Sequence, residues 1–151
     1  MRPLITSKKS HKKTVFAWGA FDLIHAGHIE YLKKARALGD TLIVAVFSDA
    51  VFSRLHDKTR PAVGVPTFIP QKERMEILSA FSFVDRVILL AKKSPIDMIE
   101  KLNPDIVVSC DLALSDAVDN LNIAFVPIKL RSRQSTSGIV EKIKNFCYLL
   151  A

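Results

Sequence analysis

Two histidines and two glycines lie close together near the beginning of the chain, in the segment 19–28. An apolar run typical of a β-strand (14–18) precedes this segment, and a helical pattern (29–38) follows it. His25 and His28 are three residues apart, so in the first turn of a helix their imidazoles project from one face. Free backbone N–H groups at a helix start, with these rings and a glycine between them, suit a polyphosphate. The segment therefore predicts phosphate binding.

The same two histidines would also fit a metal site or an ordinary helix start. A zinc site normally needs three or four protein ligands. The remaining candidate ligands are scattered along the chain: His11, His56, Cys110 and Cys147. Phosphate handling is therefore favoured over both alternatives, and we expect no metal held by protein side chains.

The size and composition of the chain indicate one globular domain. Its 151 residues are 49% hydrophobic and 25% charged, which is ordinary for a folded protein with a core. No apolar run approaches the ~20 residues that a membrane-spanning helix needs, so no membrane partner is expected. Two cysteines without a pairing framework suit the reducing cytoplasm, which is the expected location, and Cys147 is expected to be buried on the last helix.

The positive charge of the chain is concentrated at its beginning. The net charge is +7, but residues 1–13 hold five basic residues and no acid, while the rest holds 17 basic and 15 acidic residues. We expect a disordered basic leader (1–13) ahead of a nearly neutral folded domain (14–151). A nucleic-acid-binding arm is the alternative for the leader, but no aromatic residue lies among its lysines, so a nucleic-acid partner is disfavoured.

Strand and helix patterns alternate along the folded part. Apolar runs predict strands over 14–18, 41–47, 84–90, 105–109 and 123–128, and helical patterns occupy 29–38, 49–55, 70–81, 95–102 and 137–149. The stretch around 115–116 has no clear pattern, and 56–69 reads as a long loop. This alternation predicts an α/β fold, a Rossmann-like, doubly wound five-stranded parallel sheet with helices on both faces. Ligands of such sheets bind beyond the carboxyl ends of the strands, which is where 19–28 begins.

The spelling of 19–28, Gly-Ala-Phe-Asp-Leu-Ile-His-Ala-Gly-His, resembles the His-x-Gly-His signature of the nucleotidylyltransferase family, which includes cytidylyltransferases and sugar-phosphate adenylyltransferases. The resemblance extends over nearly all of 14–144. Its details, through Arg60-Pro61, 70–74 and 94–105, are most similar to the heptose-phosphate adenylyltransferase branch. The glycerol-phosphate cytidylyltransferase branch is second.

The resemblance implies a set of site residues. His25, His28 and Lys58 would be catalytic. The nucleotide would be bound by Ala17, Gly19, Ala20, Phe21, Asp22, Gly27, Arg60, Arg74, Asp111, Arg131, Ser135, Thr136 and Ser137. The match leaves open whether Arg131 or Arg133 is the contacting arginine. Ser109 and Cys110 depart from the family pattern, which has lysine in some members and usually glycine at these places.

Several of these residues can also be argued from their chemistry. Lys58 and Arg60 fall in the long loop, where basic side chains suit a triphosphate. Arg74 lies among apolar helical positions, so it needs an anionic partner, which is either phosphate or Asp85. Hydroxyls at 135–137 would bind an anion at the start of the last helix or cap that helix.

The family reaction is attack by an acceptor phosphate on the α-phosphorus of a nucleoside triphosphate, with release of pyrophosphate. The acceptor is already anionic, so positioning and charge stabilisation carry the catalysis. Mg²⁺ would be bound mainly through the nucleotide phosphates. ATP and a heptose-type sugar 1-phosphate are the expected substrates.

Three points stay open. CTP with glycerol 3-phosphate or a similar alcohol phosphate is the alternative pair, because Asp111 matches an acid found in some members. A catalytically degenerate nucleotide-binding module is the alternative of another class. A homodimer is neither indicated nor excluded.

Overall fold

The structure is a computed structural model that describes residues 12–55, 67–92, 94–129 and 136–149. Its strands are β1 (Thr14–Gly19), β2 (Thr41–Phe47), β3 (Arg86–Leu90), β4 (Ile106–Ser109) and β5 (Ala124–Pro127). They form one sheet in the order β3-β2-β1-β4-β5, and every neighbouring pair is parallel. The predicted doubly wound parallel sheet is thereby confirmed, with its change of direction between β1 and β4.

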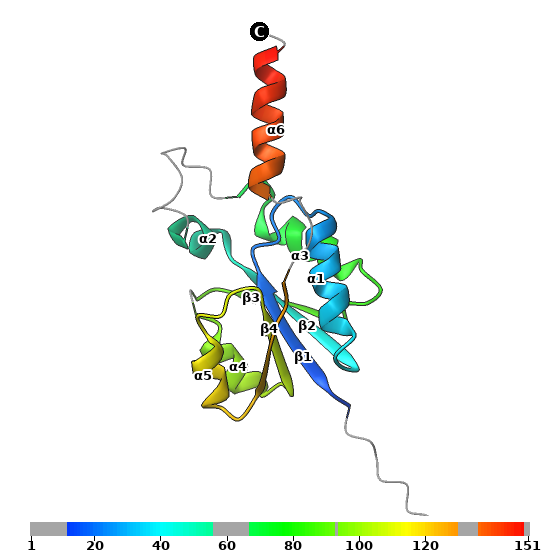
Figure 1. The fold of residues 1–151 in the computed structure, drawn as a ribbon, viewed down its shortest axis with the longest axis vertical. Helices are drawn as coiled ribbons and strands as arrows, with labels where there is room; N and C mark the ends of the chain where they lie inside the picture. The colour runs from blue at the N-terminus through cyan, green and yellow to red at the C-terminus, as the bar shows by residue number, and fades with distance from the viewer. Residues whose placement is uncertain (1–11, 56–66, 93, 130–135, 150–151) are drawn as a thin grey trace, which may run out of the picture.

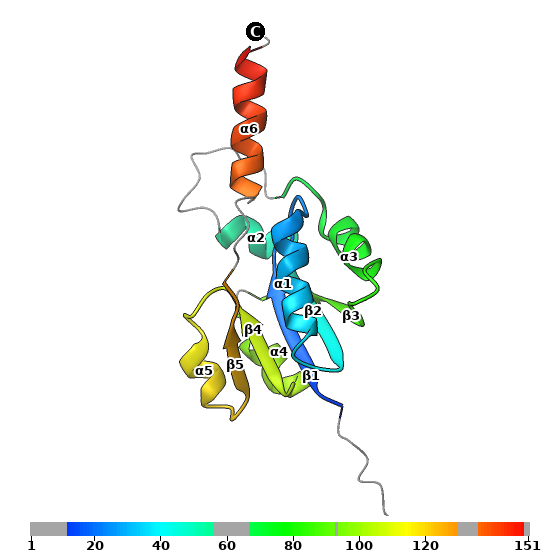
Figure 2. The same ribbon diagram turned by 45° about the vertical axis from the view of Figure 1, so that its right-hand side comes forward.

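Helices cover both faces of this sheet (Figures 1 and 2). The helices of the described residues are α1 (Ala26–Arg36), α2 (Asp49–Leu55), α3 (Gln71–Ser79), α4 (Ile96–Leu102), α5 (Ser115–Asp119) and α6 (Thr136–Leu149). Apolar residues of α1 and α3 pack on one face, and those of α4 and α5 pack on the other. The sequence did not predict α5, because this five-residue helix buries a single side chain, Val118, and has no periodic pattern to detect.

The strands alternate their side chains between two cores. Val15 and Ala17 of β1 belong to the core beneath α1 and α3, whereas Phe16 belongs to the core beneath α4 and α5. Ala17 pairs with β2 on one side and β4 on the other, and no part of it is exposed. The small side chain of Ala17 therefore fills the core, and its assignment to the nucleotide site stays a prediction.

The backbone of Lys13, just before β1, is bound to the segment that leads into β2. The Lys13 carbonyl accepts hydrogen bonds from the backbone N–H groups of Asp40 and Thr41, and its own N–H donates to the Asp40 carboxylate. Lys13, the last residue of the predicted leader, is therefore hydrogen-bonded to the segment that leads into β2. Within the described ranges, no helix is both long and apolar enough to cross a membrane.

Helix α6 stands away from the sheet and its covering helices (Figures 1 and 2). Ile143 and Phe146 on this helix are 56% and 61% exposed. Cys147 is also exposed, which corrects the prediction that the last helix buries it in the core. The apolar pattern of α6 was correct, but it identifies a helix without showing that the helix packs on its own domain.

Candidate active site

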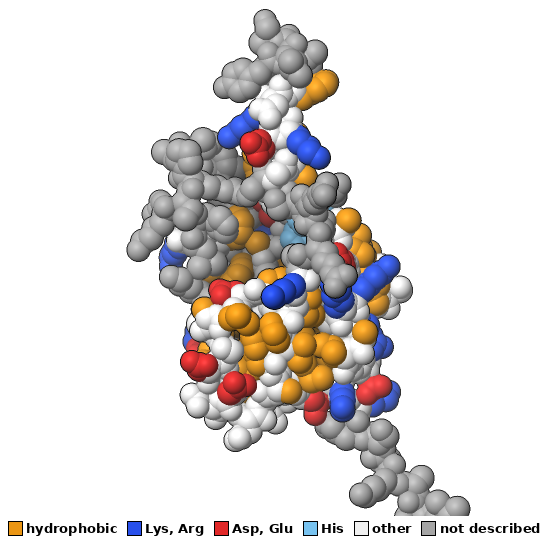
Figure 3. Space-filling view, viewed as in Figure 1, with side chains coloured by type: hydrophobic (Ala, Val, Ile, Leu, Met, Phe, Trp, Pro, Cys, Tyr) orange, Lys and Arg blue, Asp and Glu red, His pale blue; other side chains and the backbone are white. Residues whose placement is uncertain are grey.

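Three segments that the sequence assigned to the site meet at one end of the sheet. The turn after β1, the first residues of α1 and the first residues of α6 lie together there (Figures 1 and 2). Histidine surface is visible at this end of the body, just below α6 (Figure 3). The position is the carboxyl end of β1, beside the change of direction of the sheet, as expected for a ligand site of this fold.

The two histidines cap α1 with their ring nitrogens. His25 is the N-cap residue, and its Nδ1 accepts a hydrogen bond of 3.1 Å from the Gly27 backbone N–H. His28 Nδ1 accepts in return from the His25 backbone N–H at 3.4 Å, and the two rings stack with centroids 4.0 Å apart. Because each Nδ1 is an acceptor, the neutral ring carries its proton on Nε2. Each histidine therefore keeps Nε2–H as a donor for a ligand.

The surroundings keep both rings uncharged. Burial, and to a smaller extent the neighbouring His25, lower the pKa of His28 to about 4 against an opposing effect of Asp22. Burial also lowers the pKa of His25. At neutral pH the site consequently offers two neutral hydrogen-bond donors rather than two imidazolium charges.

At pH 7 we expect ¹⁵N NMR of the imidazoles to show the Nε2–H tautomer for both His25 and His28. His28 should take up its proton only near pH 4. Its pKa is lower in the folded than in the unfolded chain, so acid should remove stability as the pH falls below about 6.5. Comparison with the spectrum of His25→Asn assigns the imidazole signals to His25 and His28. Imidazolium or the Nδ1–H tautomer at pH 7 would contradict the capping geometry.

A buried aromatic ring supports the histidines from below. Phe21 is 2% exposed, and its ring centroid lies 5.4 Å from that of His28 and 6.5 Å from that of Tyr31. Gly19 is needed here because a Cβ at this position would lie only 3.2 Å from the Phe21 ring. Tyr31 is held in turn by a hydrogen bond of 2.9 Å from its hydroxyl to the Val108 carbonyl. Phe21 thus acts as packing beneath the site.

Asp22 uses its carboxylate within the protein. The side chain accepts hydrogen bonds from the backbone N–H groups of Leu23, Phe68 and Ile69 at 3.1, 2.9 and 3.0 Å. The residue is 2% exposed. A direct contact between this carboxylate and a nucleotide, as the resemblance implied, does not fit this arrangement.

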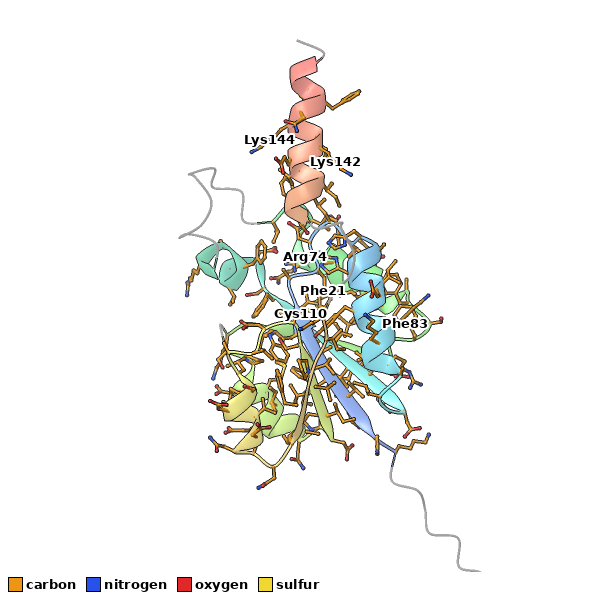
Figure 4. All side chains as sticks on the ribbon, viewed as in Figure 1. Phe21, Arg74, Phe83, Cys110, Lys142 and Lys144 are labelled. Carbon is orange, nitrogen blue, oxygen red and sulfur yellow. The ribbon has the colours of Figure 1, made fainter. Side chains whose placement is uncertain are left out.

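Arg74 is also committed to the protein, as Figure 4 shows by its place among the strand ends next to Phe21. The residue is fully buried. Its guanidinium donates to the carbonyls of Ala20, Phe47 and Ile69. An ion pair of 2.6 Å joins it to Asp49.

This partner was not among those predicted for Arg74, which were phosphate or Asp85. Burial raises the pKa of the Asp49 carboxyl, but hydrogen bonds from Gln71, Arg74 and Thr67 outweigh burial and lower it overall. Arg74 therefore orders the loops at the site. From the sequence, Asp49 was expected only as part of the short helical pattern 49–55, with no role at the site.

Some of the remaining predicted residues lie within the described part of the chain, and the others lie outside it. Thr136 begins α6 and donates its hydroxyl to the Asp22 carbonyl at 2.8 Å. Asp111, exposed just beyond β4, accepts from the Ala113 backbone N–H at 2.9 Å. The end of β1 is followed directly by Ala20. The first turns of α1 and α6 contain Gly27 and Ser137, respectively. Lys58, Arg60, Arg131, Arg133 and Ser135 lie outside the described residues.

The part of the chain that the structure describes holds no cluster suited to bind a metal through protein ligands alone. Among the described residues, no three His, Cys, Asp or Glu side chains come together as a metal site would require. The carboxylates of Asp22 and Asp49 are engaged by N–H donors instead.

Comparison with known proteins agrees with this geometry. Residues 16–147 match the family described as Cytidylyltransferase-like. "Bifunctional protein HldE" of Helicobacter pylori (strain G27) is 40% identical over 146 residues, which are 95% of this chain and 30% of that protein. The protein of the same name from Campylobacter concisus (strain 13826) is 37% identical over 147 residues, covering 93% of this chain and 29% of its own length.

A solved structure shows the same fold. The lipopolysaccharide core biosynthesis protein from Thermoplasma volcanium GSS1 has a TM-score of 0.66 and 29% sequence identity, covering 80% of this chain and 99% of its own. The chain belongs to the cytidylyltransferase-like family. It is a nucleotidyltransferase, similar over almost its whole length to the HldE proteins, and it spans about 30% of the length of those relatives.

Proposed function

We propose that this chain transfers an adenylyl group from ATP to a sugar 1-phosphate of the heptose type and releases pyrophosphate. The observation that carries the proposal is the pair of mutually capped histidines. They begin α1 at the change of direction of the sheet. A neutral Nε2–H donor on each ring, beside a helix start, is suited to phosphate oxygens whose charge grows during the transfer.

The reaction needs no catalytic base. An oxygen of the acceptor phosphate attacks the α-phosphorus, the bond to the bridging oxygen breaks, and pyrophosphate leaves with the electron pair. His25 and His28 donate to oxygens of the triphosphate, and the backbones of Gly19, Ala20 and Gly27 line the approach. Lys58, Arg60, the arginine at 131 or 133 and the hydroxyls at 135–137 bind further phosphate oxygens.

Mg²⁺ is proposed to be bound mainly by the nucleotide phosphates and water. This fits a site whose described carboxylates are already engaged by backbone and arginine donors. The ion prefers several water ligands and phosphate oxygens to a full set of protein ligands. It would neutralise charge on the leaving pyrophosphate.

The choice of substrates rests on the relatives. The HldE proteins agree with the resemblance to heptose-phosphate adenylyltransferases, and the Thermoplasma protein is named for the synthesis of a sugar-containing core. CTP with an alcohol phosphate is the second candidate, because Asp111 is exposed beyond β4, where an acid meets the base or ribose in some members. A cytoplasmic location is part of the proposal and suits the free thiols of Cys110 and Cys147.

Pyrophosphate release with each of the four nucleoside triphosphates, against a panel of sugar and polyol phosphates, tests the proposal. We expect Mg²⁺-dependent release with ATP and a heptose-type 1-phosphate. Preference for CTP with glycerol 3-phosphate would favour the second candidate. Tight nucleotide binding without turnover for any acceptor would indicate a nucleotide-binding module without catalytic activity.

A further inference from the structure

Asp22 holds together three segments that are distant in the sequence. Its carboxylate accepts from Phe68 and Ile69, 46 and 47 residues away, and its backbone carbonyl accepts from the Thr136 hydroxyl, 114 residues away. We call these three contacts the Asp22 clasp. The carboxylate is buried, and the N–H donors that surround it compensate for its loss of water.

We propose that Asp22 is a positioning residue that fixes the histidine turn relative to the two flanks of the site, rather than a ligand of the nucleotide. The proposal rests on the function proposed above. In the sequence, Phe68 and Ile69 follow Lys58 and Arg60, and Thr136 follows Ser135 and the arginine at 131 or 133. The resemblance implies that these basic and hydroxyl residues bind the nucleotide. Asp22 thus joins the histidine turn to the segment that follows each of these two stretches.

The backbone around Asp22 also needs an external support. Phe21 and Leu23, on either side of it, have φ values of 54° and 46°. Residues other than glycine rarely adopt this left-handed region, at a cost of about 1–3 kcal/mol each, and keep it only where surrounding contacts enforce it. The buried Phe21 ring enforces it on one side and the clasp on the other. Without the clasp, the turn that presents His25 and His28 is free to relax.

The clasp lies next to a second set of contacts with the same effect. Arg74 binds the Ala20 carbonyl of the histidine turn and the Ile69 carbonyl of the segment that Asp22 also holds. Asp22 therefore binds N–H groups of 68–69, and Arg74 binds a carbonyl of the same segment. Backbone N–H groups and a backbone carbonyl of this segment are thus both hydrogen-bonded at the site, and these bonds hold the segment in position.

Asp22→Asn tests the proposal, because it keeps the shape of the side chain but replaces one acceptor oxygen by a donor that faces an N–H group. Asp85→Asn is the matched control. The Asp85 carboxylate also accepts from a backbone N–H, that of Leu42, but at the amino ends of the strands, away from the site. Both variants replace a carboxylate that accepts from backbone N–H by an amide. At Asp85 the amide oxygen remains for the single N–H of Leu42, whereas at Asp22 both oxygens are engaged, so only Asp22→Asn must lose a contact.

We expect Asp22→Asn to lower kcat roughly 10–100-fold, the scale of a small misplacement of reacting groups, and Asp85→Asn to leave kcat within about twofold. Amide hydrogen exchange of Phe68 and Ile69 should become fast in Asp22→Asn while exchange in β1 and β2 stays slow. A weaker affinity for Mg²⁺ or nucleotide with these two amides still protected would overturn the proposal and make Asp22 a ligand.

If Asp22→Asn does not fold, the wild-type protein decides. The carboxyl ¹³C signal of Asp22 and the slow exchange of both amides should be unchanged when Mg²⁺ and nucleotide saturate the protein. A shift of that carboxyl signal on saturation would overturn the proposal. If the wild-type protein turns over no pair of substrates, the proposed function fails, whereas the amide readout still shows whether the clasp exists.

Discussion

His28→Ala is expected to lower turnover by roughly 10²–10³ and to change the melting temperature little, since the loss of one preorganised donor at a site of charge development has this magnitude. The His28 ring accepts one long hydrogen bond from the described residues, 3.4 Å from the His25 N–H. Its Nε2–H is the group left for the ligand. The measurement is pyrophosphate release under saturating substrates, with thermal unfolding followed in parallel.

His25 needs two substitutions, because it caps α1 as well as facing the ligand. His25→Ala loses the cap and the donor, so we expect the same fall in turnover with a further loss of about 1 kcal/mol in stability. His25→Asn keeps a side chain that caps helices well, so turnover should fall while stability stays near that of the wild type. Full activity of His25→Asn would show that His25 serves the helix alone.

Arg74→Ala is expected to reduce the free energy of unfolding by about 3 kcal/mol and Tm by roughly 6–12 °C. The substitution leaves the carbonyls of Ala20, Phe47 and Ile69 without their donor and Asp49 without its ion pair. The value is placed at the low end for a broken ion pair because the Asp49 side chain is 35% exposed. Chemical denaturation and calorimetry give the two quantities.

Two further variants control this experiment. Lys72→Ala removes an exposed cation from the same helix and should shift stability by no more than about 0.5 kcal/mol. Arg74→Lys keeps the charge, but its single nitrogen cannot reach the separate acceptors that the three guanidinium nitrogens bind, so it should recover only part of the loss. An Arg74→Ala protein of unchanged Tm and weakened nucleotide binding would restore the direct contact that the sequence analysis considered.

The strands were predicted more accurately than the connections. The apolar run at 41–47 gave the bounds of β2, because a strand buried on both faces leaves a continuous pattern. The runs at 84–90 and 123–128 extended beyond β3 and β5, whose ends are set by pairing with neighbours rather than by hydrophobicity. Helix α6 shows the limit of such patterns, since an apolar stripe does not identify its partner.

The sequence motif predicted the position of the histidine pair. It did not predict the contacts between segments that are distant in the sequence. The histidine pair needed only the spacing at 25–28, but the partner of Arg74 depended on which acid reaches it. Asp85 precedes β3, whereas Asp49 follows β2 at the carboxyl edge where Arg74 lies. In the predicted parallel sheet, Asp85 already lies at the amino ends of the strands and Asp49 at their carboxyl ends. The topology could therefore have favoured Asp49 as the partner of Arg74. The bonds of Asp22 to 68–69 had no comparable signal.

The hydrogen bond between Thr136 and Asp22 has a consequence for the order in which the protein is made. Residues 22 and 136 are 114 positions apart, so the histidine turn leaves the ribosome long before its last partner. Contacts of such separation form late, after the intervening chain has collapsed around them. A nascent chain that ends before α6 carries the histidine turn without the hydrogen bond from Thr136, and synthesis of the start of α6 makes this contact possible.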